Sequence, residues 1–245
     1  IFSKNPTVLM VTFGMNDSGY YEYNGDNAKE FGEQKYQESI KNFQQMEKRF
    51  KELPHTRIVM TGTSPYDETA QIKDNTVFKK KNETIKRIIE YQRESAARNG
   101  WEFTDWNAPM VAINQELQQK DPSFTLCGND RIHPDNDGHM VMAYLFLKAQ
   151  GFAGKDVANM EINANKKQAV KAEGCTISNI KKIGKDISFD YLAEALPYPL
   201  DTIARGWGSK KSQAEVIKEV PFMEEMNTEL LKVTGLKGQY KLLID

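Results

Sequence analysis

Residues 7–13 read TVLMVTF and residues 14–17 read GMND, and these two neighbouring segments indicate the fold class. An apolar run without polar alternation is typical of a strand that is buried on both faces, as in the parallel sheet of an α/β protein. A glycine followed by polar residues predicts a sharp turn at the carboxyl end of that strand. We therefore expect an α/β fold that includes this strand.

Strand and helix patterns alternate through the first 150 residues. Two further strands are predicted at residues 57–61 and 101–106, and four helices at about 27–53, 75–99, 110–119 and 137–150. The first helix carries one apolar stripe, because its apolar side chains recur at spacings of four and three. Strands separated by helices favour a parallel sheet with right-handed crossovers and with helices on both faces.

The pattern changes after Gly154. The sequence there predicts an antiparallel hairpin, one helix and a last hairpin, at residues 175–191, about 213–226 and 230–244. We therefore divide the chain into an α/β domain, residues 1–154, and an accessory β-rich segment with one helix, residues 155–245. No residue pattern in the accessory segment indicates a chemistry.

Composition narrows the classes of function. The chain has 33 Lys and Arg against 34 Asp and Glu, a net charge of −1, which argues against a nucleic-acid partner. Its longest apolar run, residues 140–147, is far shorter than the roughly 20 residues of a membrane-spanning helix. Two distant cysteines, Cys127 and Cys175, cannot form a disulfide framework or a four-thiolate zinc site. We expect no metal and no cofactor.

Ligands of an open α/β sheet bind beyond the carboxyl ends of its strands. The Asn16 amide follows the first strand, where it could donate a hydrogen bond to an oxyanion. Asp130 and His133 precede the last helix of the α/β domain, three positions apart, so that the carboxylate can contact imidazole Nδ1. Nε2 would then face outward as a base.

Taken together, these residues resemble the SGNH or GDSL-type hydrolases, serine esterases with a three-layer flavodoxin-like fold. The motifs Gly14-x-Asn16-Asp17 and Asp130-x-x-His133 are similar to two of that family's conserved blocks. The resemblance implies that His133 is the general base and Asp130 its orienting partner. It also implies that Asn16 and Gly14 belong to the oxyanion hole and that Asp17 supports the loop.

The family's nucleophile lies in a Gly-Asp-Ser block upstream of the Asn block, and these 245 residues contain no Gly-Asp-Ser. Residue 1 is isoleucine and the first strand begins soon after it, so we expect the serine block in preceding residues and this fragment alone to be inactive. A signal peptide there would make the protein periplasmic or extracellular. Ser18 and Ser64 are poor alternatives, because neither precedes the Asn block on a strand-to-helix turn.

Other readings of the same residues remain open. Asn16-Asp17-Ser18-Gly19 could be a plain turn, and Asp130 with His133 could be a surface pair that caps a helix. Tyr20, Tyr21 and Tyr23 could line a sugar-binding rim, while Lys79-Lys80-Lys81 is interpreted as a solvated helix face. The two functional hypotheses are a serine ester hydrolase, for example a carbohydrate acetylesterase, and a non-catalytic ligand-binding or structural module of the same fold. A phosphate-binding protein is disfavoured, since no glycine-rich phosphate loop follows any strand.

Overall fold

The computed structural model describes residues 2–244 and divides into two compact units. The first unit holds the residues up to Gly151 together with Asp201–Val220, and the second holds Phe152–Leu200 and the residues from Pro221 onward. The division expected after Gly154 placed all later residues in the accessory segment. The structure differs there, because Asp201–Val220 packs with the α/β unit.

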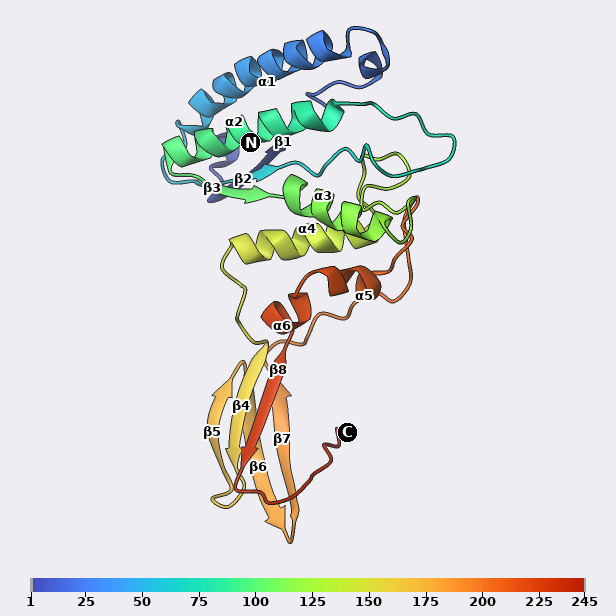
Figure 1. The fold of residues 1–245 in the computed structure, drawn as a ribbon. Helices are drawn as coiled ribbons and strands as arrows, with labels where there is room; N and C mark the ends of the chain where they lie inside the picture. Colours follow the sequence, from blue (N-terminus) through green and yellow to red (C-terminus); the bar gives the residue numbers. More distant parts are fainter. Residues whose placement is uncertain (1, 245) are drawn as a thin grey trace. The chain divides into compact units, whose positions relative to one another are not determined.

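The first unit is built on a parallel sheet of order β1-β2-β3, with strands Val8–Phe13, Arg57–Gly62 and Glu102–Asp105. Helices α1 and α2 cover one face and helices α3 and α4 the other, which gives three layers (Figure 1). These helices span Ala28–Phe50, Lys81–Asn99, Asn107–Gln118 and Asn136–Ala149. The predicted α/β class, with a parallel sheet and helices on both faces, is therefore confirmed.

Short elements complete the first unit. They are the 3-10 turns η1, η2 and η3 and the helix α5, at Phe2–Lys4, Tyr21–Asn24, Ile217–Glu219 and Gln213–Val216. Val216 of α5 is fully buried in the same apolar cluster as Met110 of α3 and Val141 of α4. Burial of apolar area stabilises this packing by about 25 cal/mol per Å², so α5 is part of the core of the first unit.

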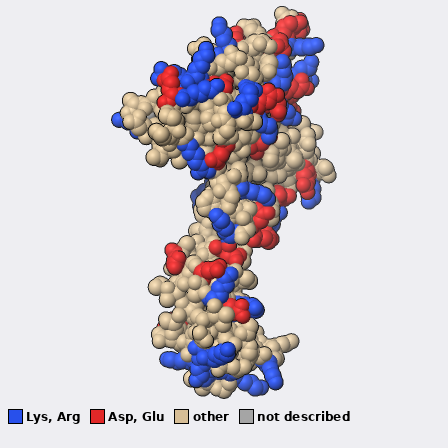
Figure 2. Space-filling model, turned by 90° about the vertical axis from the view of Figure 1, so that its left-hand side faces the viewer, with Lys and Arg blue, Asp and Glu red and all other residues tan. Residues whose placement is uncertain are grey.

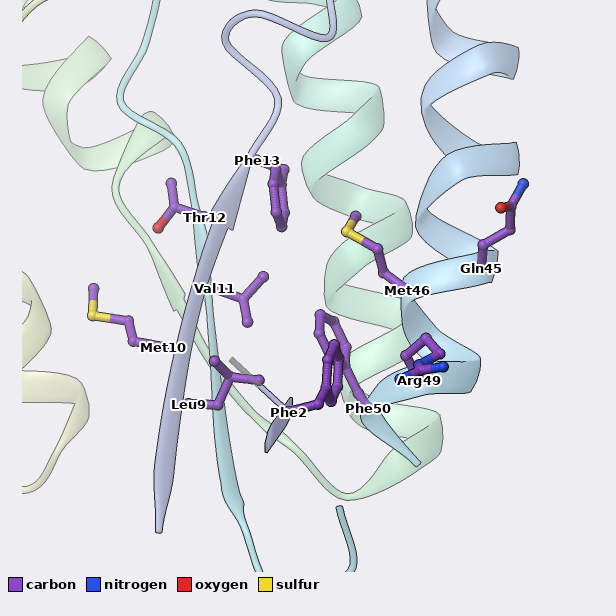
Figure 3. A pocket seen from close by; sticks show the side chains of 10 residues that line it. All are labelled: Phe2, Leu9, Met10, Val11, Thr12, Phe13, Gln45, Met46, Arg49 and Phe50. Carbon is purple, nitrogen blue, oxygen red and sulfur yellow. The ribbon is translucent and has the colours of Figure 1, made fainter. Parts of the chain in front are cut away.

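Strand β1 lies at one edge of the described sheet, and its apolar side chains are only partly covered. Figure 3 shows Val11 and Phe13 on the side of α1 and α2, while Met10 and Thr12 point to the opposite side. A groove of about 390 Å³ runs along this edge. Its lining residues are Phe2, Leu9, Met10, Val11, Thr12, Phe13, Gln45, Met46, Arg49 and Phe50. Apolar residues on both faces are the pattern of a strand that is covered on both sides.

Helix α2 begins at Lys81, six residues later than the sequence predicted. The residues before it are held in another conformation, because the Phe78 N–H donates to the Tyr66 hydroxyl at 3.0 Å and the Lys80 N–H donates to Glu68 at 2.8 Å. Lys80 itself has a left-handed backbone with φ of 70°. Contacts from distant residues therefore override the local helical pattern.

The second unit contains a sheet of order β5-β4-β8 and a hairpin of β6 and β7. Strands β4 to β8 span Ala158–Asn163, Gln168–Glu173, Cys175–Ile183, Asp186–Ala193 and Glu229–Thr234. The β6–β7 pair is antiparallel, as predicted. The predicted last hairpin is wrong, since β8 pairs in parallel with β4 and residues 235–244 form no strand. Leu231 of β8 instead packs against the buried cluster that contains Met160 and Cys175.

The single helix predicted at residues 213–226 is interrupted. Val220 is extended, with φ of −137° and ψ of 148°, and a separate helix α6 follows at Phe222–Met226. The cause is Pro221, because a proline disfavours the helical conformation of the residue before it. The two halves of the predicted helix belong to different units of the chain.

Charged side chains are distributed unevenly in the second unit. Two turns, between β4 and β5 and between β6 and β7, lie at the same end of this unit, where Lys182 donates to Asn165 at 2.8 Å. Lysines gather at this end (Figure 2), and they are Lys166, Lys167, Lys181, Lys182 and Lys185. Within residues 2–244, none of the helices has the length and apolar character that crossing a membrane requires.

Candidate active site

The loop that carries Asn16 starts at Gly14, directly after β1. Gly14 has φ of +135°, a conformation that side chains rarely adopt, and a Cβ at this position would lie 3.1 Å from Thr63. The Gly14 N–H donates to Asp17 Oδ2 at 2.9 Å, and the Ser18 N–H donates to the Gly14 carbonyl at 3.0 Å. The Asp17 carboxylate therefore binds the first residue of the loop. Gly14 shapes the loop, but its N–H already donates to Asp17 and is therefore not free to donate to an oxyanion.

The side-chain amide of Asn16 is oriented by Tyr20. The Tyr20 hydroxyl donates to Asn16 Oδ1, which leaves the Nδ2 protons available to a ligand at the exposed end of the loop. Burial, with smaller contributions from the charges of Asp130 and Asp17, raises the pKa of Tyr20. Tyr20 therefore keeps its proton at neutral pH and acts as a donor. The sequence suggested that Tyr20 could line a sugar-binding rim, and the structure shows that its hydroxyl orients the side-chain amide of Asn16, the candidate oxyanion residue.

Lys81, at the start of α2, contacts the same loop and is fully buried. Its Nζ donates to the carbonyl oxygens of Met15 and Gly19 at 2.7 and 2.6 Å and to Ser18 Oγ at 2.6 Å. The ammonium also lies 3.9 Å from the ring centre of Tyr20, in cation–π geometry. The expectation that residues 79–81 form a solvated face is wrong for Lys81, whereas the other two lysines are exposed.

Asp130 and His133 form the contact that their spacing predicted. Asp130 Oδ2 lies 2.6 Å from His133 Nδ1, and Asp130 Oδ1 accepts the backbone N–H groups of Ile132 and His133 at 2.9 and 3.0 Å. Burial alone would raise the pKa of Asp130, but the hydrogen bonds from His133 and Ile132 outweigh it and lower that pKa. The carboxylate is thus held ionised and orients the imidazole, whose side chain is 66% exposed.

Arg131 anchors this turn from inside the unit. It has a left-handed backbone with φ of 68°, and its side chain is buried. The guanidinium donates to the carbonyl oxygens of Asp67 and Ala70 at 3.1 and 2.7 Å and to Asn75 Oδ1 at 2.9 Å. A buried arginine that satisfies three acceptors fixes the backbone from which Asp130 and His133 project. The residue types around it gave no sign of this role, because its partners lie more than 50 positions away in the sequence.

The Asn16 loop and the Asp130–His133 turn meet in one region of the first unit. Met15 and Ile132, the neighbours of Asn16 and His133 in the sequence, pack against the same buried cluster of Tyr66, Ile85 and Ile89. The charge of Asp130 also acts on Tyr20, which contacts Asn16 directly. The structure therefore brings together the two motifs that the sequence singled out.

The two serines named as alternative nucleophiles are both buried. Ser18 Oγ donates to the Met15 carbonyl at 2.9 Å and accepts from Lys81, so its hydroxyl is fully occupied by the loop. Ser64 is likewise buried, in the segment that follows β2. Neither hydroxyl is presented to a substrate. Among residues 2–244, no three side chains of the His, Cys, Asp and Glu types are grouped to hold a metal ion.

Residues 2–141 match the GDSL-like Lipase/Acylhydrolase family, and this match covers more than half of the 245 residues. The chain therefore belongs to the GDSL-like Lipase/Acylhydrolase family. Both the Asn16 loop and the Asp130–His133 turn lie within the matched region. The three-layer α/β arrangement of the first unit is consistent with the SGNH-hydrolase fold. Comparison with curated proteins finds no match.

Among solved structures, the chain is similar to a catalytic mutant of Axe2, an acetylxylan esterase from Geobacillus stearothermophilus. That similarity has 17% identity and a TM-score of 0.40, over 62% of this chain and 63% of that chain. The acetyl xylan esterase AlAXEase gives 20% identity and a TM-score of 0.39, over 61% and 69% of the two chains. LAE5, an alpha/beta hydrolase enzyme from the metagenome of Lake Arreo, Spain, gives 19% identity and a TM-score of 0.39, over 62% of each chain. The chain thus spans less than two thirds of Axe2 and LAE5.

Proposed function

We propose that this chain carries the general base, its orienting carboxylate and one oxyanion donor of a serine ester hydrolase. The observation that carries the proposal is the 2.6 Å contact between Asp130 Oδ2 and His133 Nδ1, close to the Asn16 loop. A carboxylate on Nδ1 keeps the proton there and leaves Nε2 as the basic nitrogen. Membership of a lipase and acylhydrolase family supports the same reaction class.

In the proposed reaction a serine hydroxyl attacks the acyl carbon of an ester. His133 accepts the serine proton and returns it to the leaving alcohol, and water then releases the acyl group by the same two proton transfers. Asn16 donates from Nδ2 to the tetrahedral oxyanion, in the orientation that Tyr20 imposes on its amide. Asp130 stays ionised and stabilises the imidazolium that forms at each transfer.

The serine of this proposal comes from a segment outside these 245 residues. Ser18 and Ser64 are buried, and no Gly-Asp-Ser occurs in the sequence. The apolar edge of β1 offers such a segment a place to pair, since β1 presents apolar side chains to both sides (Figure 3). Pairing there would bring a serine at the end of the added strand next to the loop that begins at Gly14.

The substrate that we propose is a small acyl ester, such as an acetate, of a carbohydrate alcohol. The exposed imidazole of His133 and the exposed Asn16 leave room for a bulky leaving alcohol above the site. A deeply enclosed site would select instead for small alcohols. The acyl group needs only the space next to the oxyanion donor.

Hydrolysis of p-nitrophenyl acetate tests this proposal with two proteins, residues 1–245 and a longer chain extended upstream through a Gly-Asp-Ser. We expect negligible activity from the first and full activity from the second, since loss of a triad nucleophile costs about 10⁶ in kcat in a well-studied protease. In the longer chain, His133→Ala should abolish activity and Asn16→Ala should cost roughly 10²–10³ in kcat. Turnover by residues 1–245 that depends on Ser18 or Ser64 would contradict the external serine.

A non-catalytic module is the second candidate function, favoured by the occupied hydroxyl of Ser18. An inactive longer chain that still binds oligosaccharide would support this candidate over an esterase.

A further inference from the structure

An exposed tryptophan lies next to the candidate base. Trp207 is 76% exposed, and its ring centre lies 6.1 Å from that of His133, with the two planes at 70°. Its loop, residues 205–209, belongs to the segment that returns to the first unit. Isolated exposed apolar side chains are common and need no explanation. Trp207 differs because the surrounding structure holds its backbone in place.

Both main-chain polar groups of Trp207 are bound by side chains of the Asp130–His133 region. The Trp207 N–H donates to Asp135 Oδ1 at 2.9 Å, and its carbonyl accepts from Asn129 Nδ2 at 2.6 Å. Asn129 precedes Asp130 by one residue, and Asp135 follows His133 by two. The loop is therefore fastened to both ends of the turn that carries the candidate base.

Glycines on either side of Trp207 make this fastening possible. A Cβ on Gly206 would lie 2.2 Å from the Asp135 side chain, and a Cβ on Gly208 would lie 2.2 Å from the Asn129 side chain. Gly206 also has φ of +125°, which other residues rarely adopt. Any larger residue at either position would push the loop away from the turn. The sequence thus keeps the indole at a fixed distance from His133 while it remains in solvent.

The groups around the indole indicate what kind of ligand would fit. One face of a sugar ring is rich in C–H groups and can lie flat on an aromatic ring, while its hydroxyls hydrogen-bond at the edges. The Asn129 and Asp135 side chains are engaged by the Trp207 main chain, so the polar partner next to the indole is the exposed imidazole of His133. A purely aliphatic ligand would cover that imidazole without giving it a hydrogen bond, at a cost in desolvation.

Charge favours a neutral ligand. Asp130 and Asp135 lie beside the Trp207 loop, and two cations in or next to that loop are already paired. Arg205 contacts Asp201 at 2.6 Å, and Lys210 contacts Asp121 at 3.1 Å. An anionic ligand would meet the like charges of Asp130 and Asp135.

We propose that Trp207 is a substrate-binding residue that stacks on a neutral pyranose ring of the leaving alcohol, next to His133. The inference rests on the proposed ester hydrolysis and specifies its substrate as an ester of a neutral saccharide. A sugar ring stacked on the indole would place its acylated oxygen within reach of His133 Nε2, because the centres of the indole and imidazole rings are only 6.1 Å apart.

Binding of an unreactive ligand tests the inference without catalysis. Residues 1–245 would be titrated with neutral tetrasaccharides of β-1,4-linked glucose, xylose and mannose, and with tetragalacturonate, by calorimetry and tryptophan fluorescence. We expect at least one neutral saccharide to bind and to change the fluorescence, and the uronate to bind more weakly. Trp207→Ala should weaken binding about tenfold or more, the scale of one aromatic stacking contact. Trp207→Phe should restore part of the loss.

Two controls separate stacking from other effects. The half-buried Trp101 lies in the core of the α1–α2 side, so Trp101→Phe should leave binding and the fluorescence change in place. Gly208→Ala keeps the indole but displaces its loop, so it should weaken saccharide binding as Trp207→Ala does. Absence of binding by all four saccharides, or equal binding by the Trp207→Ala variant, would overturn the inference.

Kinetics of the longer chain distinguish this inference from the proposed function. With an acetylated tetrasaccharide, Trp207→Ala should lower kcat/KM about tenfold or more, mainly through KM, and the loss on p-nitrophenyl acetate, which has no sugar ring to stack, should be clearly smaller. A longer chain that binds saccharide through Trp207 but hydrolyses no ester would contradict the proposed function alone. Equal losses on both esters would contradict the stacking role and leave the esterase intact.

Discussion

The Nζ atom of Lys81 lies 2.7 Å from the main-chain oxygen of Met15, so a buried cation from the start of α2 holds the loop that presents Asn16. Two further acceptors in the same loop, the Gly19 carbonyl and Ser18 Oγ, complete its coordination. A hydrogen bond to a charged group contributes about 1.5–3 kcal/mol. The orientation of the candidate oxyanion residue therefore depends on a side chain that touches no substrate.

Lys81→Met should destabilise the protein, because it leaves buried acceptors unpaired, at about 1–3 kcal/mol. The exposed neighbour Lys79 provides a matched control, and Lys79→Met should change stability by less than about 0.5 kcal/mol. Urea denaturation of the three proteins measures this difference. Equal stability of Lys81→Met and the parent would show that the buried contacts are not formed.

The same substitution should alter the pH dependence of stability. Burial lowers the pKa of Lys81 to about 7, against the opposing effect of the negative charges of Asp17 and Glu68, while the pKa of an unfolded lysine is about 10.4. Between these values the unfolded chain binds a proton that the folded chain has released, so the free energy of unfolding rises with pH. The parent should gain stability relative to Lys81→Met from pH 7 to pH 10. A constant difference across that range would contradict the lowered pKa.

Asp137→Asn should stabilise the protein above pH 6. Asp137 is fully buried, and burial raises its pKa to about 6, whereas the pKa of an unfolded aspartate is about 3.9. The folded state holds the extra proton between these values, so the free energy of unfolding falls as pH rises through them. Asparagine can still accept from the Gly138 N–H and has no charge to bury. We expect a gain of roughly 2 kcal/mol at pH 7.5 and none at pH 3.5, with the exposed Asp26→Asn as the unchanged control.

Arg131→Met should cost about 2–4 kcal/mol in unfolding free energy, since two buried carbonyl oxygens and the half-buried Asn75 Oδ1 lose their donor. Arg57 is the comparison, because its bridge to Glu102 is exposed and contributes about 0–1 kcal/mol. Nuclear magnetic resonance of the His133 ring adds a readout of the site. Its signals should broaden or shift in Arg131→Met and stay as in the parent in Arg57→Met. An unchanged His133 signal in Arg131→Met would show that Arg131 does not fix the geometry of the turn.

Gly138→Ala should destabilise the start of α4. A Cβ there would lie 2.2 Å from the Leu126 carbonyl oxygen and 2.8 Å from Pro134 Cβ, so the helix would have to move away from the preceding turn. Such overpacking typically costs about 1–3 kcal/mol. Gly25→Ala, whose Cβ would come no closer than 3.4 Å to a neighbour, should change the melting temperature little. Similar melting temperatures for the two variants would contradict the close contact.

The sequence predicts the elements whose signal is local. The apolar run of β1 and the stripe of α1 identify a strand and a helix without knowledge of their partners. The spacing of Asp130 and His133 likewise predicts their contact, because a turn brings side chains three positions apart close together. These features were therefore predictable from residue types and positions alone.

The predictions that were wrong, and the features that were missed, depend on contacts between residues distant in the sequence. The predicted partner of β8 lay a few residues onward, but the strand pairs with β4, about 70 residues earlier. Lys81 looks identical to its exposed neighbours in sequence, and only the fold places it under the Asn16 loop. Trp207 lies in a segment assigned to the accessory region, so its proximity to His133 had no local signal.

The return of Asp201–Val220 to the first unit has a consequence for biosynthesis. The sheet and helices α1 to α4 have all been synthesised once Gly151 is made, but Val216, which packs in their core, is translated some 65 residues later. At about 5–20 residues per second this leaves an interval of several seconds. During that interval the nascent α/β unit lacks Val216 and leaves apolar surface uncovered, which is the condition under which nascent chains are prone to aggregate.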